Sequence, residues 1–122
     1  MDNDNIIAVK SKAFAIRTVN LYKYLLHTKK EFILSKQFVR SGTSIGANVK
    51  EAIQGQSKKD FLSKLQVSLK EASETEYWLD LLVSSDYITG EQYESINADC
   101  AELLKLLTAI ITTTKKSLNI YP

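Results

Sequence analysis

The fold of this chain is decided most clearly by residues 89–116, TGEQYESINADCAELLKLLTAIITTTKK. Apolar side chains recur there mostly three and four residues apart, which places them along one side of an α-helix. Thr89 and Gln92 have the spacing of a capping box, in which each side chain satisfies a free backbone amide at the helix start. The stretch therefore predicts a helix over 90–116 with this buried face: Tyr93, Ile96, Cys100, Leu103, Leu104, Leu107, Ile110 and Ile111.

Three further helices are predicted upstream, over 6–29, 36–54 and 58–84. Ser35 is the expected cap of the second, and Ser57, followed by Asp60, of the third. The first helix has an unusually broad apolar stripe, which favours contacts beyond its own core, between subunits among others. The expected stripe of the first helix is Phe14, Thr18, Leu21, Tyr22 and Leu25, widened by Ile16, Val19 and Leu26. That of the second helix is Phe38, Ile45, Val49 and Ala52, and that of the third is Leu62, Leu65, Leu69, Ala72, Leu79 and Val83.

The chain of 122 residues fits one domain, 1–122, with 44% apolar and 25% charged residues. Its four glycines and single proline leave almost nothing to interrupt long helices. Because short loops force neighbouring helices to pack antiparallel, we expect an all-α, antiparallel up-down-up-down four-helix bundle. Glu76 lies on the third stripe and, with Glu71 and Asn48, is a candidate for a polar contact between helices.

Gly42 and Gly46 lie four residues apart in the second helix, within a run of small residues, and each costs a helix about 1 kcal/mol relative to alanine. The favoured interpretation is close packing of another helix against them. A backbone surface open to phosphate or another ligand is the alternative.

The sequence favours no catalytic, cofactor or metal site, and no small-molecule substrate is expected. Cys100 is most simply a core residue, since neither it nor the lone His27 has the neighbours that a metal or redox site needs. Glu71, Glu74 and Glu76 are carboxylates without a recognisable catalytic partner. No apolar run approaches the roughly 18 residues of a membrane span, so we expect a cytoplasmic protein that does not enter membranes.

Charge is unevenly distributed along the chain. Residues 1–70 hold 13 Lys or Arg against 5 Asp or Glu, and residues 71–122 hold 3 against 9. A solvated lysine-rich face is one interpretation, and contact with a neighbouring subunit's acidic surface is another. A third is a surface that binds nucleic acid through phosphate attraction, formed by Lys10, Lys12, Arg17, Lys23, Lys29, Lys30, Lys36, Arg40, Lys58 and Lys59, with Lys64 nearby.

The segment from Phe38 to Ala52, followed by 57–61 and by the run 69–79, resembles the four-helix-bundle family named after 23S ribosomal RNA intervening sequences. The resemblance spans nearly the whole chain. One departure is that Ala52 follows Glu51 where many members have glycine, which here comes at Gly55. The matching motif and helix-packing positions are Arg40, Ser41, Gly42, Ser44, Ile45, Gly46, Asn48 and Glu51.

This resemblance implies a bundle often assembled as a ring of five subunits, with no enzymatic activity or cofactor and an unknown biochemical role. A relative of the same fold binds reverse transcriptase and RNA. We therefore expect a non-enzymatic homo-oligomeric binding scaffold, a pentameric ring, whose partner is RNA or an RNA-handling protein. A purely protein-binding or structural module is the alternative. Tyr77 and Trp78 are either core residues or an anchor between subunits.

Overall fold

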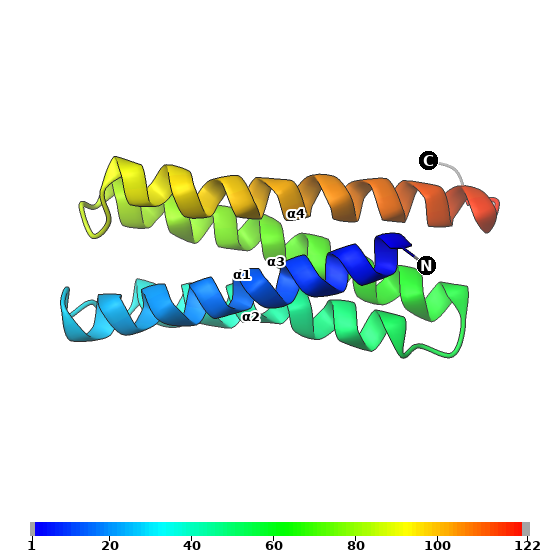
Figure 1. Ribbon diagram of the computed structural model, residues 1–122, viewed down its shortest axis with the longest axis horizontal. Helices are drawn as coiled ribbons and strands as arrows, with labels where there is room; N and C mark the ends of the chain where they lie inside the picture. The colour runs from blue at the N-terminus through cyan, green and yellow to red at the C-terminus, as the bar shows by residue number, and fades with distance from the viewer. Residues whose placement is uncertain (1, 121–122) are drawn as a thin grey trace.

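The computed structural model describes residues 2–120, and that part of the chain contains four helices and no strand (Figure 1). The predicted all-α fold is confirmed, and the helix limits agree with prediction to within four residues. The first two helices begin and end somewhat earlier than expected, and the last two almost coincide with their predictions. The helices are α1 (Asp2–His27), α2 (Leu34–Ile53), α3 (Lys58–Ser84) and α4 (Gly90–Ser117).

Each helix runs in the direction opposite to the one before it, with α1 and α4 on one side of the bundle and α2 and α3 behind them (Figure 1). The contacts agree, because residue numbers rise along one helix as they fall along its neighbour. Between α2 and α3, Arg40 binds Glu71 and Lys64 binds Glu51. The turns 28–33 and 85–89 therefore lie at one end of the bundle, and the turn 54–57 lies at the other.

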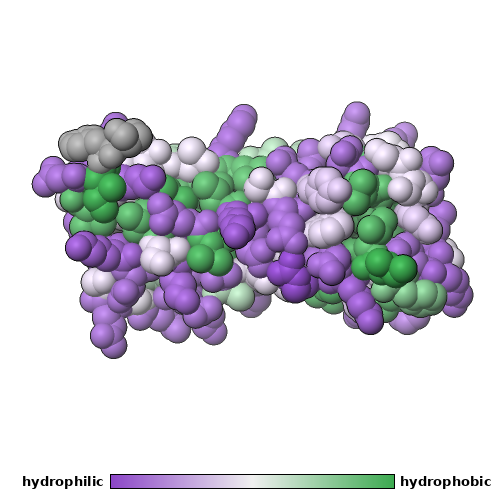
Figure 2. Space-filling view, turned by 180° about the vertical axis from the view of Figure 1, so that it is seen from behind, coloured by the Kyte–Doolittle hydropathy of each residue, from purple (hydrophilic) through white to green (hydrophobic). Residues whose placement is uncertain are grey.

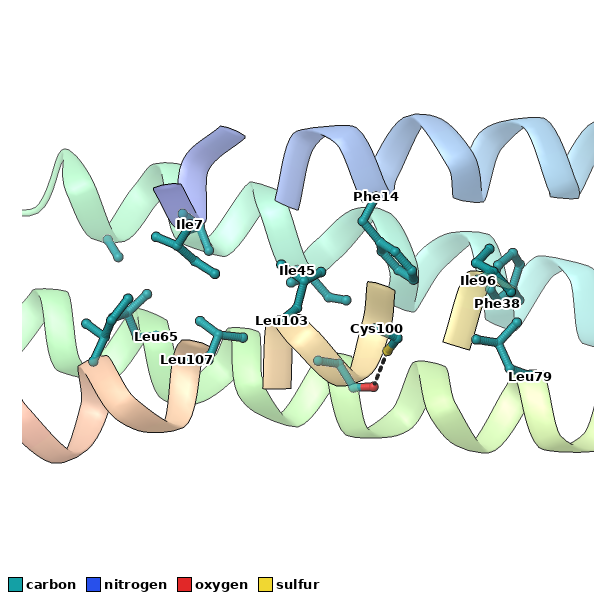
Figure 3. Packing of buried hydrophobic residues seen from close by; sticks show 14 of the residues in the cluster. Ile7, Phe14, Phe38, Ile45, Leu65, Leu79, Ile96, Cys100, Leu103 and Leu107 are labelled. Atoms are coloured by element: carbon teal, nitrogen blue, oxygen red, sulfur yellow. Dashed lines mark hydrogen bonds between the residues drawn. The ribbon is translucent and has the colours of Figure 1, made fainter. Parts of the chain in front are cut away.

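The core runs the length of the bundle and takes side chains from all four helices (Figure 3). Cys100 lies within it with no exposed surface, and its thiol donates to the carbonyl oxygen of Ala72 at 3.4 Å. Burial, assisted by the negative charge of Glu76, raises the pKa of the Cys100 thiol to about 12. The prediction that Cys100 is a core residue is confirmed.

The buried faces of α1 and α3 differ from the predicted apolar stripes, partly because small polar residues are buried there as well. The stripe of α1 also includes Ile7 and Ser11, and that of α3 includes Ser68, Thr75 and Leu82, whereas Leu69 and Val83 are only partly buried. The Ser68 hydroxyl donates to the carbonyl of Ile45 at 2.8 Å, so a polar side chain at this helix crossing is fully satisfied.

Gly42 and Gly46 meet α1 closely, as the favoured interpretation predicted. A Cβ atom at Gly42 would lie 2.6 Å from Cγ2 of Thr18, and one at Gly46 would lie 3.3 Å from the backbone oxygen of Ser11. Carbon atoms in good contact are about 3.5–4.0 Å apart. The two glycines therefore allow α1 and α2 to approach more closely than any side chain would permit.

Candidate nucleic-acid interface

The two N-terminal helices and the turn between them carry many more cations than carboxylates. Between Asn5 and Lys50 the only carboxylate is Glu31, and it is buried. The same segment holds nine cations: Lys10, Lys12, Arg17, Lys23, Lys29, Lys30, Lys36, Arg40 and Lys50. The structure thus concentrates positive charge on α1, α2 and the turn that joins them.

Three of the predicted binding residues are engaged within the chain. Lys10 binds Glu102 at 3.1 Å and Arg17 binds Asp99 at 2.7 Å, both across the seam between α1 and α4. Arg17 also donates to the backbone oxygen and hydroxyl of Ser95. These cations join α1 to α4, which packs less extensively on α1 than α2 does.

Arg40 is the third engaged cation, and it joins α2 to α3. Its guanidinium donates to Glu71 at 3.3 Å and to Glu74, which also accepts from the Trp78 ring nitrogen at 3.2 Å. Glu71 thus makes the predicted polar contact between helices. Asn48 does not, because its amide donates to the carbonyl of Ser44 in its own helix.

The remaining predicted residues fall into two groups at opposite ends of the bundle. One group lies near the α1–α2 turn and consists of Lys23, Lys29, Lys30 and Lys36, with Lys12 nearer the start of α1. All five are exposed and form no ion pair with the described residues. Lys58 and Lys59 begin α3 at the other end, separated from the turn by the length of α2, about 30 Å at 1.5 Å per residue. The predicted set does not form one continuous patch. We call Lys23, Lys29, Lys30 and Lys36 the turn lysines.

The α1–α2 turn is held by Glu31, which sequence reasoning missed. Its carboxylate accepts hydrogen bonds from the backbone amides of Ile33, Leu34 and Ser35 at 3.0, 3.0 and 2.6 Å. Its own amide donates to the carbonyl of Leu25 at the end of α1. The prediction that Ser35 caps α2 is wrong: Ser35 lies inside the helix, and its hydroxyl donates to the carbonyl of Glu31.

The chemistry of Glu31 fits this capping role. Burial by itself would raise the pKa of its carboxyl, but the hydrogen bonds from Leu34, Ser35 and Ile33 favour the ionised form and bring the pKa below its ordinary value. The negative charge also faces the positive end of the α2 dipole. Glu31 therefore caps α2, and it forms no ion pair with the turn lysines.

A shallow groove of about 420 Å³ runs between α1 and α2. Ala8, Ala15 and Ala47 contribute to its apolar lining, and Lys12 and Lys50 supply its positive charge. It lies on the same two helices as the turn lysines. Its α2 lining runs from Thr43 to Ile53, so Lys12 and Lys50 form a second pair of cations in the half of the bundle away from the turn.

The opposite pair of helices is acidic. Residues 71–104 contain no Lys or Arg and nine carboxylates, of which Asp80, Asp86, Glu91 and Glu94 are exposed and in no ion pair with the described residues. The α3–α4 turn lies within this stretch, at the same end of the bundle as the α1–α2 turn (Figure 1). One end thus carries a positive turn beside a negative one.

The motif shared with the resembling family has packing roles in this structure. Ser41 is buried and accepts from the Thr75 hydroxyl at 2.9 Å, and Ser44 donates to the carbonyl of Arg40. Ile45 is a core residue, and Glu51 binds Lys64 at 3.3 Å. With the two glycines, these residues fix α2 between α1 and α3.

Tyr77 and Trp78 differ in their surroundings. Trp78 packs partly against the core, whereas Tyr77 is 55% exposed on α3 and contacts the Trp78 ring edge to face, with centroids 5.2 Å apart. Of these two residues, only Tyr77 presents a largely free aromatic ring at the surface.

Among the side chains that the structure describes, in residues 5–120, no cluster of three or more is suited to hold a metal ion. None of the four helices in this part of the chain has a stretch long and apolar enough to cross a membrane.

The chain matches known proteins in both sequence and structure. The sequence profile described as 23S rRNA-intervening sequence protein matches residues 3–109. A crystal structure from Bacteroides thetaiotaomicron, of a protein with unknown function from the S23 ribosomal protein family, is 60% identical, with a TM-score of 0.89 over 90% of this chain and 98% of that one. No curated protein matches significantly. The chain therefore belongs to the 23S rRNA-intervening sequence protein family.

Proposed function

We propose that this protein is a non-enzymatic binding scaffold whose α1–α2 side holds RNA through its phosphates. The observation that carries the proposal is the charge of residues 5–50, where nine cations accompany a single carboxylate that is buried as a cap. Phosphate attraction needs a concentration of unpaired cations and no sequence readout. The four turn lysines supply it, and binding of this kind suits the cytoplasmic location expected from the sequence.

Salt dependence tests this function directly. Four phosphate contacts to a single strand predict a slope of about −2.8 in log K against log salt, which weakens binding about 50-fold between 50 and 200 mM. We expect fluorescence anisotropy with labelled RNA to give a slope of this size. No retention of RNA at low salt would refute the proposed function.

A matched pair of variants locates the site. Replacing the four turn lysines by alanine should remove most of the binding and flatten the salt slope. The control removes the same charge at the opposite end of the bundle, by Lys58→Ala, Lys59→Ala, Lys115→Ala and Lys116→Ala. Equal losses in both variants would show that net charge alone, rather than the α1–α2 side, is responsible.

Self-association is a second function that a specific observation favours. Val9 and Ile16 lie seven residues apart on one face of α1 and are 69% and 54% exposed. The charged side chains on α1 between residues 5 and 27 are all positive, so pairing with a second α1 is electrostatically disfavoured. We propose head-to-tail contact with the acidic α3–α4 side of another copy, with Tyr77 and Trp78 at the interface, closing as the pentameric ring that the family resemblance implies.

Light scattering tests this assembly. We expect a mass about five times the 13.8 kDa of one chain. Val9→Asp with Ile16→Asp should yield monomers, because the two charges would replace the exposed apolar side chains of α1. Tyr77→Ala tests the anchor with little effect on folding, because its ring is largely exposed. A wild-type mass near 13.8 kDa at tens of micromolar would exclude the ring.

A further inference from the structure

The α1–α2 turn carries two apolar side chains that the core does not use. Phe32 is 54% exposed and Ile33 is 77% exposed, and both lie between the turn lysines Lys30 and Lys36. The α2–α3 face is largely hydrophilic, with separate groups of hydrophobic side chains, one of them toward the end opposite the chain termini (Figure 2). An aromatic ring and an aliphatic side chain surrounded by cations form a surface suited to a ligand that is both anionic and apolar.

Hydrogen bonds hold the turn in one conformation, and that conformation keeps Phe32 and Ile33 exposed. The amide of Glu31 donates to the end of α1, and its carboxylate accepts hydrogen bonds from the start of α2. The segment that contains Phe32 and Ile33 is therefore tied to both helices. Lys30 adopts a left-handed backbone conformation, φ 55°, that directs the chain into the turn. Phe32 and Ile33 therefore stay at the surface without a conformational change that would cost binding energy.

We propose that Phe32 is a stacking platform for an unpaired base, and that the α1–α2 side binds single-stranded RNA in preference to duplex. This inference rests on the proposed function and specifies its substrate class. Proteins that bind single strands combine a positive track for the backbone with aromatic rings on which bases stack. Bases inside an RNA duplex are already stacked on one another, so Phe32 gains nothing from them.

The positive track extends beyond the turn. From Lys36 in the first turn of α2 to Lys50 at the groove is 14 residues, about 21 Å along the helix. Lys12 lies on the other wall of that groove. A strand whose base stacks on Phe32 can therefore follow α1 and α2 from the turn lysines to this second pair of cations.

An anionic membrane surface would also attract lysines and accept Phe32 and Ile33. The arrangement of the two turns disfavours it, because a flat surface approaching this end meets the α3–α4 turn as well (Figure 1). That turn and its flanks carry Asp80, Asp86 and Glu91, all exposed, which the same surface would repel. A single strand is narrow enough to follow the positive side alone.

The experiment compares Phe32 variants on single-stranded and duplex RNA. Anisotropy is measured with a labelled single strand of about ten nucleotides, within the usual range of site sizes, and with its duplex. Phe32→Leu keeps an apolar side chain and removes the ring, so it should weaken single-strand binding between about 5- and 150-fold, the range for losing one stacked base. Phe32→Trp should retain binding, and Ile33→Ala should change it little.

The salt slope separates stacking from charge. It should be the same in Phe32→Leu as in the wild type, because no phosphate contact is lost, and circular dichroism should show unchanged helicity. Phe32→Leu binding as tightly as the wild type, or duplex binding as tightly as the single strand, would overturn the inference alone and leave the proposed function standing. Failure of the wild type to bind either RNA at low salt would refute both.

Vesicles of phosphatidylserine and phosphatidylcholine provide the remaining control. We expect no sedimentation of the wild type with them that depends on Phe32. Vesicle binding lost in Phe32→Leu, together with RNA binding that is unchanged, would assign the turn to a membrane surface and overturn the inference.

Discussion

Replacing Gly42 by alanine tests the close packing of α1 on α2. The new Cβ would lie 2.6 Å from Cγ2 and 2.7 Å from Oγ1 of Thr18. Thr18 is fully buried, and its hydroxyl donates to the carbonyl of Phe14 at 2.9 Å, so moving it also loses a hydrogen bond. Overpacking of this kind costs about 1–3 kcal/mol and the lost bond about 1 kcal/mol, whereas alanine gains about 1 kcal/mol in helix propensity.

The net expectation for Gly42→Ala is a destabilisation of about 1–3 kcal/mol. For a chain of this length each kcal/mol lowers Tm by about 4 °C, so thermal unfolding followed by circular dichroism should show a fall of about 4–12 °C. Gly90→Ala is the control, since no atom lies within 4 Å of the Cβ that it adds. Its Tm should change little.

A double-mutant cycle identifies the cause. Thr18→Ala removes Cγ2 and Oγ1, the two atoms that a Cβ at position 42 would meet most closely, so the double variant should be more stable than the sum of the single effects by about 1 kcal/mol or more. An unchanged or higher Tm for Gly42→Ala, or strictly additive effects, would refute the close approach of the two helices.

Three further predictions concern the fold. Glu31→Gln should destabilise the protein by about 1 kcal/mol at pH 7. Folding lowers the pKa of the Glu31 carboxyl, so its contribution to stability is complete above the ordinary glutamate pKa of about 4.3. That contribution is lost as pH falls through the pKa of the folded state. Unfolding in urea should thus show the difference shrinking toward pH 3, and an equal difference at both pH values would contradict the role. Cys100 is buried and its thiol has a pKa of about 12, so it should resist alkylation at pH 8 in the folded protein and react in denaturant. Mass spectrometry measures the labelling, and rapid labelling of the folded protein would place Cys100 outside the core. Asp86→Gly should raise the free energy of unfolding by about 0.5–1 kcal/mol, because Asp86 has φ 66°, a backbone conformation that glycine adopts without steric cost. A loss of stability in urea unfolding would show that no backbone strain at this position is relieved.

The fold could be predicted from the sequence because its main signals are local. The capping box of Thr89 and Gln92 forms with both of its hydrogen bonds, and the Ser57 hydroxyl accepts from the amide of Asp60 as expected. Spacing within α4 identified six of its buried residues, although Tyr93 and Leu104 are only partly buried and the buried Thr114 was not predicted. Such patterns need no knowledge of what lies across the bundle.

The missed features depend on contacts or turn geometry that spacing does not encode. Glu31 caps α2 from outside the helix, through a turn that also uses the carbonyl of Leu25. Ser68 and Thr75 are buried because the helices cross closely there, and a polar residue is not recognised as core from periodicity. In each case the decisive partner lies on another helix or in the turn.

The candidate site was predicted in composition but not in arrangement. The sequence identified an excess of cations, but it did not show that Arg17 and Arg40 reach carboxylates of α4 and α3. Nor did it show that Lys58 lies a helix length away from the turn. Which cations stay free depends on which helices are neighbours, and only the folded structure supplies that.

Lysine footprinting tests the claim that the α1–α2 side holds RNA most directly. The protein is acetylated with and without a single-stranded RNA at low salt, and modification of each lysine is measured by mass spectrometry. We predict protection of Lys29, Lys30 and Lys36, and unchanged modification of Lys105 and Lys116 on α4. Equal protection of every exposed lysine, or protection confined to α4, would contradict the account.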